Sequence, residues 1–461
     1  MPTTMRLEKR LAVLVVAVLG VLAPSRPASA VPIFARKYQT SCQTCHIVFP
    51  KLNAFGEAFR LNGYRMPAET EEQVKETPVS LGSEAYAKTW PSMVYPSTIP
   101  GNVPLAINVK LADVYSSEFD GTETKITRND FQFPQEINLF TAGTLGDKFS
   151  FLGELTFEDG AGVSIERAHF SANSFAGPEH AANFKVGLFA PDVADGFQEM
   201  WLMTNNGIDT VFGYDPLGPA GGTGVADPAN GISIPGNVRA IEFYGVAKHR
   251  FFYTVGMTNG LGPVTSKSGT DPNSRRDFYA RFDYKFGGMG LDGDTTGQTL
   301  PPENWRENSV RLGLFGYRGD GSDVSVPFDD GAGNITHVID RRYDRVGLYV
   351  SWFCRDLNLF GVYLHGKDSL SVTDPAAVES RTDPTYDTWF VQGDYVIRPP
   401  FQVSLRYEHL KPGDPAALAT RLANANFTYL VRANIKLMLE YQVDVQQTKN
   451  YNLAAVLRFA M

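Results

Sequence analysis

The sequence predicts an all-β fold: a transmembrane antiparallel β-barrel of about sixteen strands that follows a small α-helical N-terminal segment. From about residue 101 onward, apolar and polar residues alternate with a period of two, which is typical of strands whose faces meet different surroundings. The alternating stretches are about ten residues long, which matches a tilted membrane-spanning strand. The 20 Tyr, 31 Phe and 5 Trp residues crowd the apolar faces and their ends, as interfacial girdles require.

A soluble β-sandwich would also alternate, so strand number and loop length matter as well. Sixteen candidate strands begin near residues 103, 129, 148, 162, 183, 239, 249, 276, 308, 342, 357, 386, 401, 420, 433 and 450. Connections are tight near residues 145, 248, 355, 399 and 432, and long at 117–128, 193–238, 260–275, 320–341 and 369–385. We expect the short turns to face the periplasm. The segment 289–307 is long on the side that should be short, so the count could differ by one pair there.

The first thirty residues have the pattern of a secretory signal. Arg6, Lys9 and Arg10 precede an apolar run over residues 11–23, and Ala28-Ser29-Ala30 offers a small-residue cleavage site. A retained membrane anchor is the alternative. We expect residues 1–30 to be removed on export across the inner membrane of a bacterium.

Charge and cysteine content narrow the function classes. The formal charge is −8, and residues 1–30 hold four basic residues and one acidic residue, so the mature chain would carry −11. This charge argues against nucleic acid as a partner. Three cysteines in an exported chain of this size are no disulfide framework. Cys354 stands alone at a strand end and is expected to be a buried or lipid-facing thiol.

The other two cysteines belong to the motif Cys42-Gln43-Thr44-Cys45-His46. Two thiols at this spacing can add to the two vinyl groups of one haem, and the following histidine can reach the iron as proximal ligand. A zinc site requires four ligands, and the chain offers no second close cysteine pair. A thioredoxin-like redox pair lies at a helix start after a strand, and this pattern is not seen around the motif. The motif therefore predicts one covalent haem c at Cys42, Cys45 and His46. An apolar stripe at helical spacing would cover one haem face: Leu52, Phe55, Ala58 and Phe59.

The second axial ligand of the iron has two methionine candidates. Met66 follows the helical stretch closely and is the expected ligand, although a packed apolar side chain is the alternative. Met93 is the reserve candidate, and a vacant or water-ligated position stays open. We expect a monohaem segment over residues 31–100 and the barrel over 101–461, with the haem segment on the periplasmic side or inside the barrel lumen as a plug.

This combination resembles the fused outer-membrane cytochrome–porins of iron-oxidising bacteria. The local resemblance is carried by Phe34-Ala35-Arg36, by the haem motif, and by Pro50, Leu52, Asn53 and Phe55-Gly56. The resemblance implies electron transfer from an extracellular donor, often ferrous iron, to a periplasmic carrier such as a soluble cytochrome. It implies ferrous iron oxidation as an activity, Cys42 and Cys45 as thioether sites, and His46 as proximal ligand.

Two other hypotheses remain at this stage: a solute porin whose haem segment is a structural or regulatory plug, and a periplasmic haem sensor on a non-membrane β scaffold. Loop 193–238 could fold into the lumen as a constriction or stay an ordinary extracellular loop. Carboxylates in two long loops could gather ferrous ions, although a solvated outer surface is favoured. These carboxylates are Asp320, Asp323, Asp329, Asp330, Asp374, Glu379 and Asp383.

Overall fold

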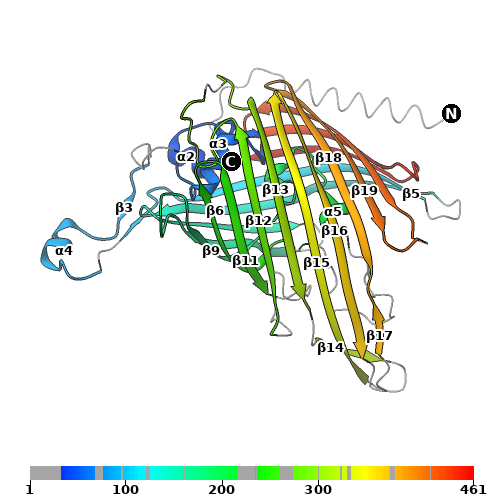
Figure 1. Cartoon of the computed structure of the whole chain (residues 1–461). Coiled ribbons are helices and arrows are strands. Elements are labelled where there is room, and N and C mark those ends of the chain that lie inside the picture. The colour runs from blue at the N-terminus through cyan, green and yellow to red at the C-terminus, as the bar shows by residue number, and fades with distance from the viewer. Residues whose placement is uncertain are drawn as a thin grey trace.

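The computed structural model is a slanted β-barrel with a small helical N-terminal segment at one end (Figure 1). It describes residues 33–67, 76–94, 97–119, 125–158, 162–214, 234, 236–259, 274–298, 301–321, 324–329, 334–373, 379–415 and 417–461. The predicted signal at residues 1–30 lies outside the described residues.

The N-terminal segment consists of short elements. They are α2 (Ile33–Tyr38), the 3-10 turn η1 (Cys42–Thr44), β1 (His46–Val48), β2 (Lys51–Leu52), α3 (Ala54–Leu61), β3 (Val79–Ser80), α4 (Glu84–Thr89) and β4 (Thr98–Ile99). Among the described residues, no helix has the length and apolarity needed to cross a membrane.

The described part of the chain closes a barrel of sixteen long antiparallel strands, which confirms the predicted fold class. They are β5 (Leu105–Phe119), β6 (Lys125–Leu145), β7 (Phe149–Glu158), β8 (Gly162–Ala172), β9 (Asn183–Phe189), β10 (Val238–Ala247), β11 (Phe251–Asn259), β12 (Arg276–Gly287), β13 (Glu307–Asp320), β15 (Asn334–Arg355), β16 (Leu357–Thr373), β18 (Thr385–Arg398), β19 (Phe401–Pro412), β20 (Thr420–Arg432), β21 (Ile435–Asp444) and β22 (Tyr451–Ala460). The first strand, β5, pairs with the last, β22, and so closes the cylinder.

Two short strands lengthen neighbouring hairpins beyond the barrel wall. β14 (Val324–Asp329) pairs with β15, and β17 (Glu379–Thr382) pairs with β16. For this reason β15 begins at residue 334 rather than near 342. The suspect segment 289–307 adds no strand in its described residues before Glu307, where β13 begins. Its length has another use, because it covers the N-terminal segment.

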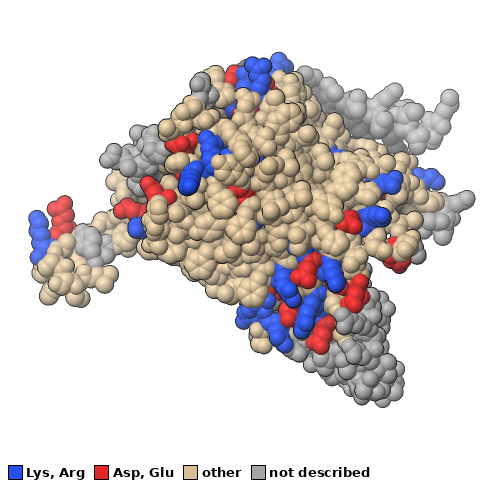
Figure 2. All heavy atoms as spheres, in the orientation of Figure 1, with Lys and Arg blue, Asp and Glu red and all other residues tan. Residues whose placement is uncertain are grey.

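The two faces of the wall differ in the way that a lipid-facing barrel requires. On β12, Phe278 and Phe286 face outward and are exposed, whereas Arg281 and Asp283 face the lumen and are buried. β13 repeats the pattern, with Leu314 outward and Arg311 inward. On the face that Figure 2 shows, a broad uncharged band crosses the barrel, and charged residues gather mainly toward its ends. A soluble sandwich would bury the apolar face instead, so the barrel is inside out relative to such a fold.

Candidate functional site

The two motif cysteines lie on one tight turn. Ser41 caps η1 by accepting a hydrogen bond from the Gln43 backbone N–H, and the Cys45 N–H donates to the Cys42 carbonyl at 3.2 Å. Both thiols are free, as the addition to haem vinyl groups requires. Burial raises the pKa of Cys42, and burial together with the nearby Cys42 raises the pKa of Cys45 to about 12. Both thiols are therefore protonated at neutral pH.

The imidazole of His46 is oriented by the backbone that follows it. Its Nδ1 lies 3.0 Å from the Pro50 carbonyl oxygen. A carbonyl only accepts, so Nδ1 carries the proton and Nε2 keeps its lone pair for a metal, which is the usual arrangement of a ligating histidine. Desolvation lowers the pKa of His46 to about 4, which keeps the ring neutral at pH 7. The free thiols and the oriented, neutral imidazole fit a covalent haem c.

Asn53 and Gly56 hold the haem motif against helix α3. The Asn53 N–H donates to the Cys45 carbonyl at 3.0 Å, and its side chain caps α3 by accepting from the Gly56 N–H at 2.8 Å. A Cβ atom on Gly56 would lie only 2.0 Å from the Cys45 carbonyl oxygen, so only glycine allows this approach. In the sequence, Asn53 and Gly56 served only to indicate a family resemblance. Their contacts with the Cys45 backbone could not be predicted from it.

The predicted apolar stripe has two different environments. Phe59 is buried and packs against the rings of Phe34, Tyr38 and Tyr64, with centroids 5.2–6.2 Å apart. This aromatic cluster holds α2 against α3, so Phe59 serves the core of the segment. Leu52 lines the cavity between the segment and the barrel wall.

The two methionine candidates lie in different settings. The residue before Met66, Arg65, donates to the Gly146 carbonyl of the β6–β7 turn at 2.7 Å, and the residue after it packs against Gly293. Met93 is exposed on an arm that extends away from the barrel (Figure 1). The described neighbours of these two positions do not include His46, and the distal ligand stays a prediction.

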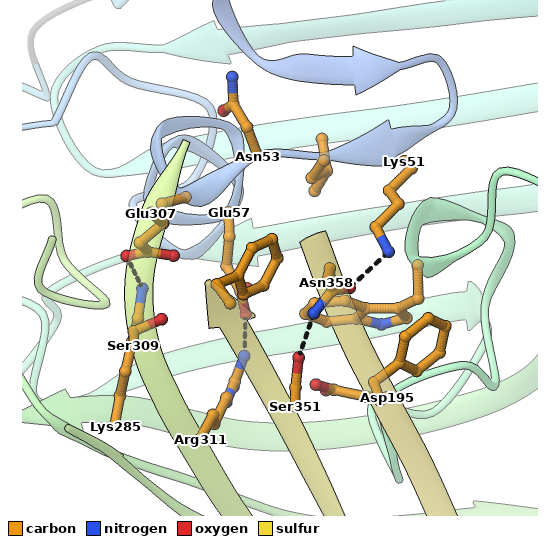
Figure 3. A pocket seen from close by; sticks show the side chains of 15 residues that line it. Lys51, Asn53, Glu57, Asp195, Lys285, Glu307, Ser309, Arg311, Ser351 and Asn358 are labelled. Atoms are coloured by element: carbon orange, nitrogen blue, oxygen red, sulfur yellow. Dashed lines mark hydrogen bonds and ion pairs between the residues drawn. The ribbon is translucent and has the colours of Figure 1, made fainter. Parts of the chain in front are cut away.

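The N-terminal segment sits in the mouth of the barrel at the end with the short turns. The Lys51 Nζ donates to Asn358 Oδ1 at 2.7 Å and to Asp394 Oδ2 at 2.5 Å, as Figure 3 shows for Asn358. The Lys436 Nζ donates to the Phe49 carbonyl at 2.7 Å. Asn358, Asp394 and Lys436 all lie at the short-turn ends of their strands, so the structure joins distant parts of the chain at this rim.

A buried charge network binds α3 to the lumen wall. Glu57 accepts from Arg311 at 2.6 Å, and Arg60 pairs with Asp192 at 2.8 Å. Asp192 also pairs with the fully buried Arg281, whose guanidinium reaches three carboxylates in all. Burial alone would raise the pKa of Asp192, but Arg60 and Arg281 hold it well below its usual range. Helix α3, the strand β12 and the loop after β9 thus share one set of ion pairs.

That loop is the described part of the predicted loop 193–238, and it folds into the lumen. It includes η3 (Glu199–Trp201) and α5 (Asp209–Phe212), and it packs on tyrosine and phenylalanine rings of the inner wall. Glu440 accepts from the backbone N–H groups of Asn205 and Asn206, which fixes the loop to the wall. Met203 belongs to the same buried apolar cluster as Ile47 and Val48, the two residues after His46. The luminal alternative is therefore correct for residues 193–214, while residues 215–233 of this loop lie outside the described residues.

The space between the segment and the wall is a small polar cavity. Counted together with the solvent that it opens to, its empty space measures about 500 Å³. Charged side chains from the N-terminal segment, the luminal loop and the barrel wall line this cavity, as Figure 3 shows. They are Lys51, Glu57, Asp195, Lys285, Glu307 and Arg311. Trp201 from the luminal loop also lines this cavity, with its ring 5.6 Å from the Arg311 guanidinium.

The carboxylates that were weighed as an iron-gathering alternative to a solvated outer surface lie mostly outside the described residues. Asp323, Asp330 and Asp374 lie outside the described residues, as do the side chains of Asp329 and Glu379. Asp320 and Asp383 fall within the described part of the chain, which shows no cluster of three or more His, Cys, Asp or Glu residues suited to a metal ion.

The fold and site define a porin-like, closed sixteen-stranded barrel whose mouth holds a small Cys-x-x-Cys-His segment. No known protein family and no curated protein matches the sequence. Among solved structures, OmpT of Vibrio cholerae has a TM-score of 0.45 and 10% identity over 83% of this chain and 100% of that chain. Salmonella typhi OmpF scores 0.48 with 9% identity over 77% and 97%. An anion-selective porin from Comamonas acidovorans scores 0.46 with 12% identity over 77% and 99%. Likeness of this degree concerns the fold alone.

The close approach of Gly56 generates a first prediction. In the chain folded without haem, the methyl group that Gly56→Ala adds would clash with the Cys45 carbonyl. Because such overpacking costs about 1–3 kcal/mol, the motif should move away from α3 and expose Cys45. Maleimide labelling of Cys45 should accelerate several-fold. The control Gly236→Ala adds a methyl with no atom within 4 Å and should leave the rate unchanged. Equal labelling rates in the two variants would show that α3 does not pack closely against the haem motif.

The buried Lys51–Asp394 pair generates a second prediction. Lys51→Met leaves a buried carboxylate unpaired, which typically costs about 3–5 kcal/mol, so backbone hydrogen exchange over residues 42–61 should accelerate by about 100-fold or more. Adding Asp394→Asn removes the uncompensated charge and should restore much of the protection. The exposed pair of Arg128 and Glu118 provides the control, and Arg128→Gln should change nothing measurable. Unchanged exchange in Lys51→Met would contradict the docking described above.

Proposed function

We propose that this chain is an outer-membrane cytochrome–porin that passes electrons from an extracellular donor to a periplasmic carrier. The observation that supports it best is the His46–Pro50 hydrogen bond beside two free thiols, in a segment that sits in the mouth of a closed barrel. Cys42 and Cys45 would hold the haem by thioethers, and His46 would ligate its iron. A bound haem would supply one-electron transfer.

The barrel supports both the outer-membrane placement of the chain and the orientation that we propose for it. The outward side of the barrel wall is apolar, which suits the hydrocarbon of a membrane. The lumen-facing side of the wall carries polar and charged groups. The short turns face the periplasm in barrels of this kind, and the N-terminal segment contacts those turns. The haem segment would therefore stand at the periplasmic end, where a soluble carrier such as a cytochrome can reach it.

The chain's own residues would orient and shield the site. The Pro50 carbonyl fixes the tautomer and orientation of His46, and Asn53 and Gly56 fix the Cys45 backbone. The luminal loop contacts the residue pair after His46 through Met203, which excludes water from that side. The barrel wall would separate the site from the lipid, which conducts no electrons. Met66 remains our proposed distal ligand.

A solute porin with a haem-bearing plug is the second candidate. It is favoured by the polar, charge-lined cavity beside the segment and by the ion pairs that hold the segment in the mouth. Those ion pairs would serve a plug as well as an electron carrier. The two candidates differ in whether the haem changes its redox state when a donor is added outside.

Ferrous iron added to the oxidised protein in sealed vesicles tests the proposal. We expect the haem absorption bands to shift to the reduced form, because the donor side and the haem would be connected through the lumen. Cys45→Ala, which removes one thioether site, should lose most of the covalent haem and the signal, whereas Cys354→Ser should behave as wild type. The absence of reduction by iron or any other external donor, with solute flux intact, would favour the plugged porin.

A further inference from the structure

Residues 76–94 and 97–104 form an arm that extends away from the barrel (Figure 1). Strand β3 pairs with β4 through Val79 opposite Ile99 and Ser80 opposite Thr98. Helix α4 lies at the far end of this two-stranded ribbon. A ribbon of this kind is stable in water only with support from another surface, since isolated two-stranded hairpins are marginal.

The base of the arm lies on the outside of the barrel wall. An added Cβ at Gly143 would sit 3.0 Å from both Pro100 and the Phe151 ring. Phe151 and Gly143 face outward, because their neighbours Leu152 and Ala142 pack on the lumen side against α2. Pro100 therefore continues the outward, lipid-facing surface of β6 and β7, while α2 and α3 occupy the lumen on the opposite side of the same strands.

The base also lies at the level of an aromatic girdle. Phe149 and Phe170 stack on the outward face at the short-turn end, with ring centroids 5.4 Å apart, next to Phe151. Aromatic rings at this level mark the boundary between headgroups and hydrocarbon. The arm thus leaves the barrel where the membrane surface on the short-turn side is expected.

The arm exposes an unusual proportion of apolar side chains. Trp90 is 57% exposed, Met93 60% and Val94 90%. Further exposed apolar residues are Val79, Leu81 and Val103. Only Glu76, Glu84 and Lys88 carry charge among the described residues of the arm. An exposed apolar patch of this kind is typical of a surface that contacts another protein or a membrane.

We propose that this arm is a membrane anchor that inserts its apolar side chains into the periplasmic leaflet of the bilayer. Phospholipid is the occupant because the arm continues a surface that already faces lipid and begins at the girdle. Trp90 and Tyr86 suit the interface, where an aromatic body meets hydrocarbon and a polar atom meets headgroups. The flexible stem of Lys88 lets its ammonium group reach the headgroups. The anchor rests on the membrane placement of the barrel and not on electron transfer.

Nitroxide labels on the full-length protein in phosphatidylethanolamine–phosphatidylglycerol vesicles test the anchor. Labels at Trp90→Cys and, separately, Met93→Cys are placed in a Cys354→Ser background, and the background chain without an added cysteine is the blank. We expect relaxation by dissolved oxygen to exceed relaxation by a water-soluble nickel chelate several-fold at both positions. Two positions are used because one substitution alone could disturb the arm.

Two controls distinguish the possible failures. Leu314→Cys labels the outward face of β13 and should report lipid, whereas Leu418→Cys labels an exposed apolar residue in the β19–β20 hairpin and should report water. Arm labels that resemble Leu418→Cys, while Leu314→Cys reports lipid, would overturn the anchor and leave the barrel in the membrane. Dipolar broadening between arm labels of two chains would overturn it in favour of a second copy. A water-like signal at Leu314→Cys would instead overturn the membrane placement.

Discussion

The structure depends on buried ion pairs that hold a small N-terminal segment in the mouth of a wide barrel. A sixteen-stranded cylinder leaves space inside, and a segment of this size has too little core to stand alone. Two ion pairs join the segment to the wall, Lys51 with Asp394 and Glu57 with Arg311. The segment thereby fills space inside the barrel and gains the support that its own core lacks. Charges of this kind are costly to bury singly, so each partner requires the other. The luminal loop completes the packing through Asp192 and Met203.

This arrangement gives the haem motif its surroundings. The carbonyl of Pro50 and the neighbouring chain set the orientation of His46, and the same turn places Phe49 against Lys436 of the wall. The site is therefore built from the segment and the barrel together. An electron conduit and a plugged porin would share this architecture, and they differ only in what passes through it.

The sequence predicted the barrel well because a period of two is a local signal that repeats along each strand. On β12, the alternation of Phe278 and Arg281 translates directly into lipid-facing and lumen-facing positions. The haem motif is local too. The pairing of Lys51 with Asp394 was not predictable, because nothing near either residue in the sequence identifies its partner. The same holds for Gly56, whose necessity arises from a carbonyl eleven positions earlier, at Cys45, which a folded turn brings close. The role of segment 289–307 as a cover also required the fold.

The proposed electron transfer requires a haem bonded to this segment, and the intact mass of the polypeptide purified from its native outer membrane tests this requirement most directly. We predict the mass of the processed chain plus one haem, stable to denaturation and lost in part when Cys42 or Cys45 is replaced. An unmodified mass, from protein that is otherwise folded and embedded in the membrane, would contradict the account.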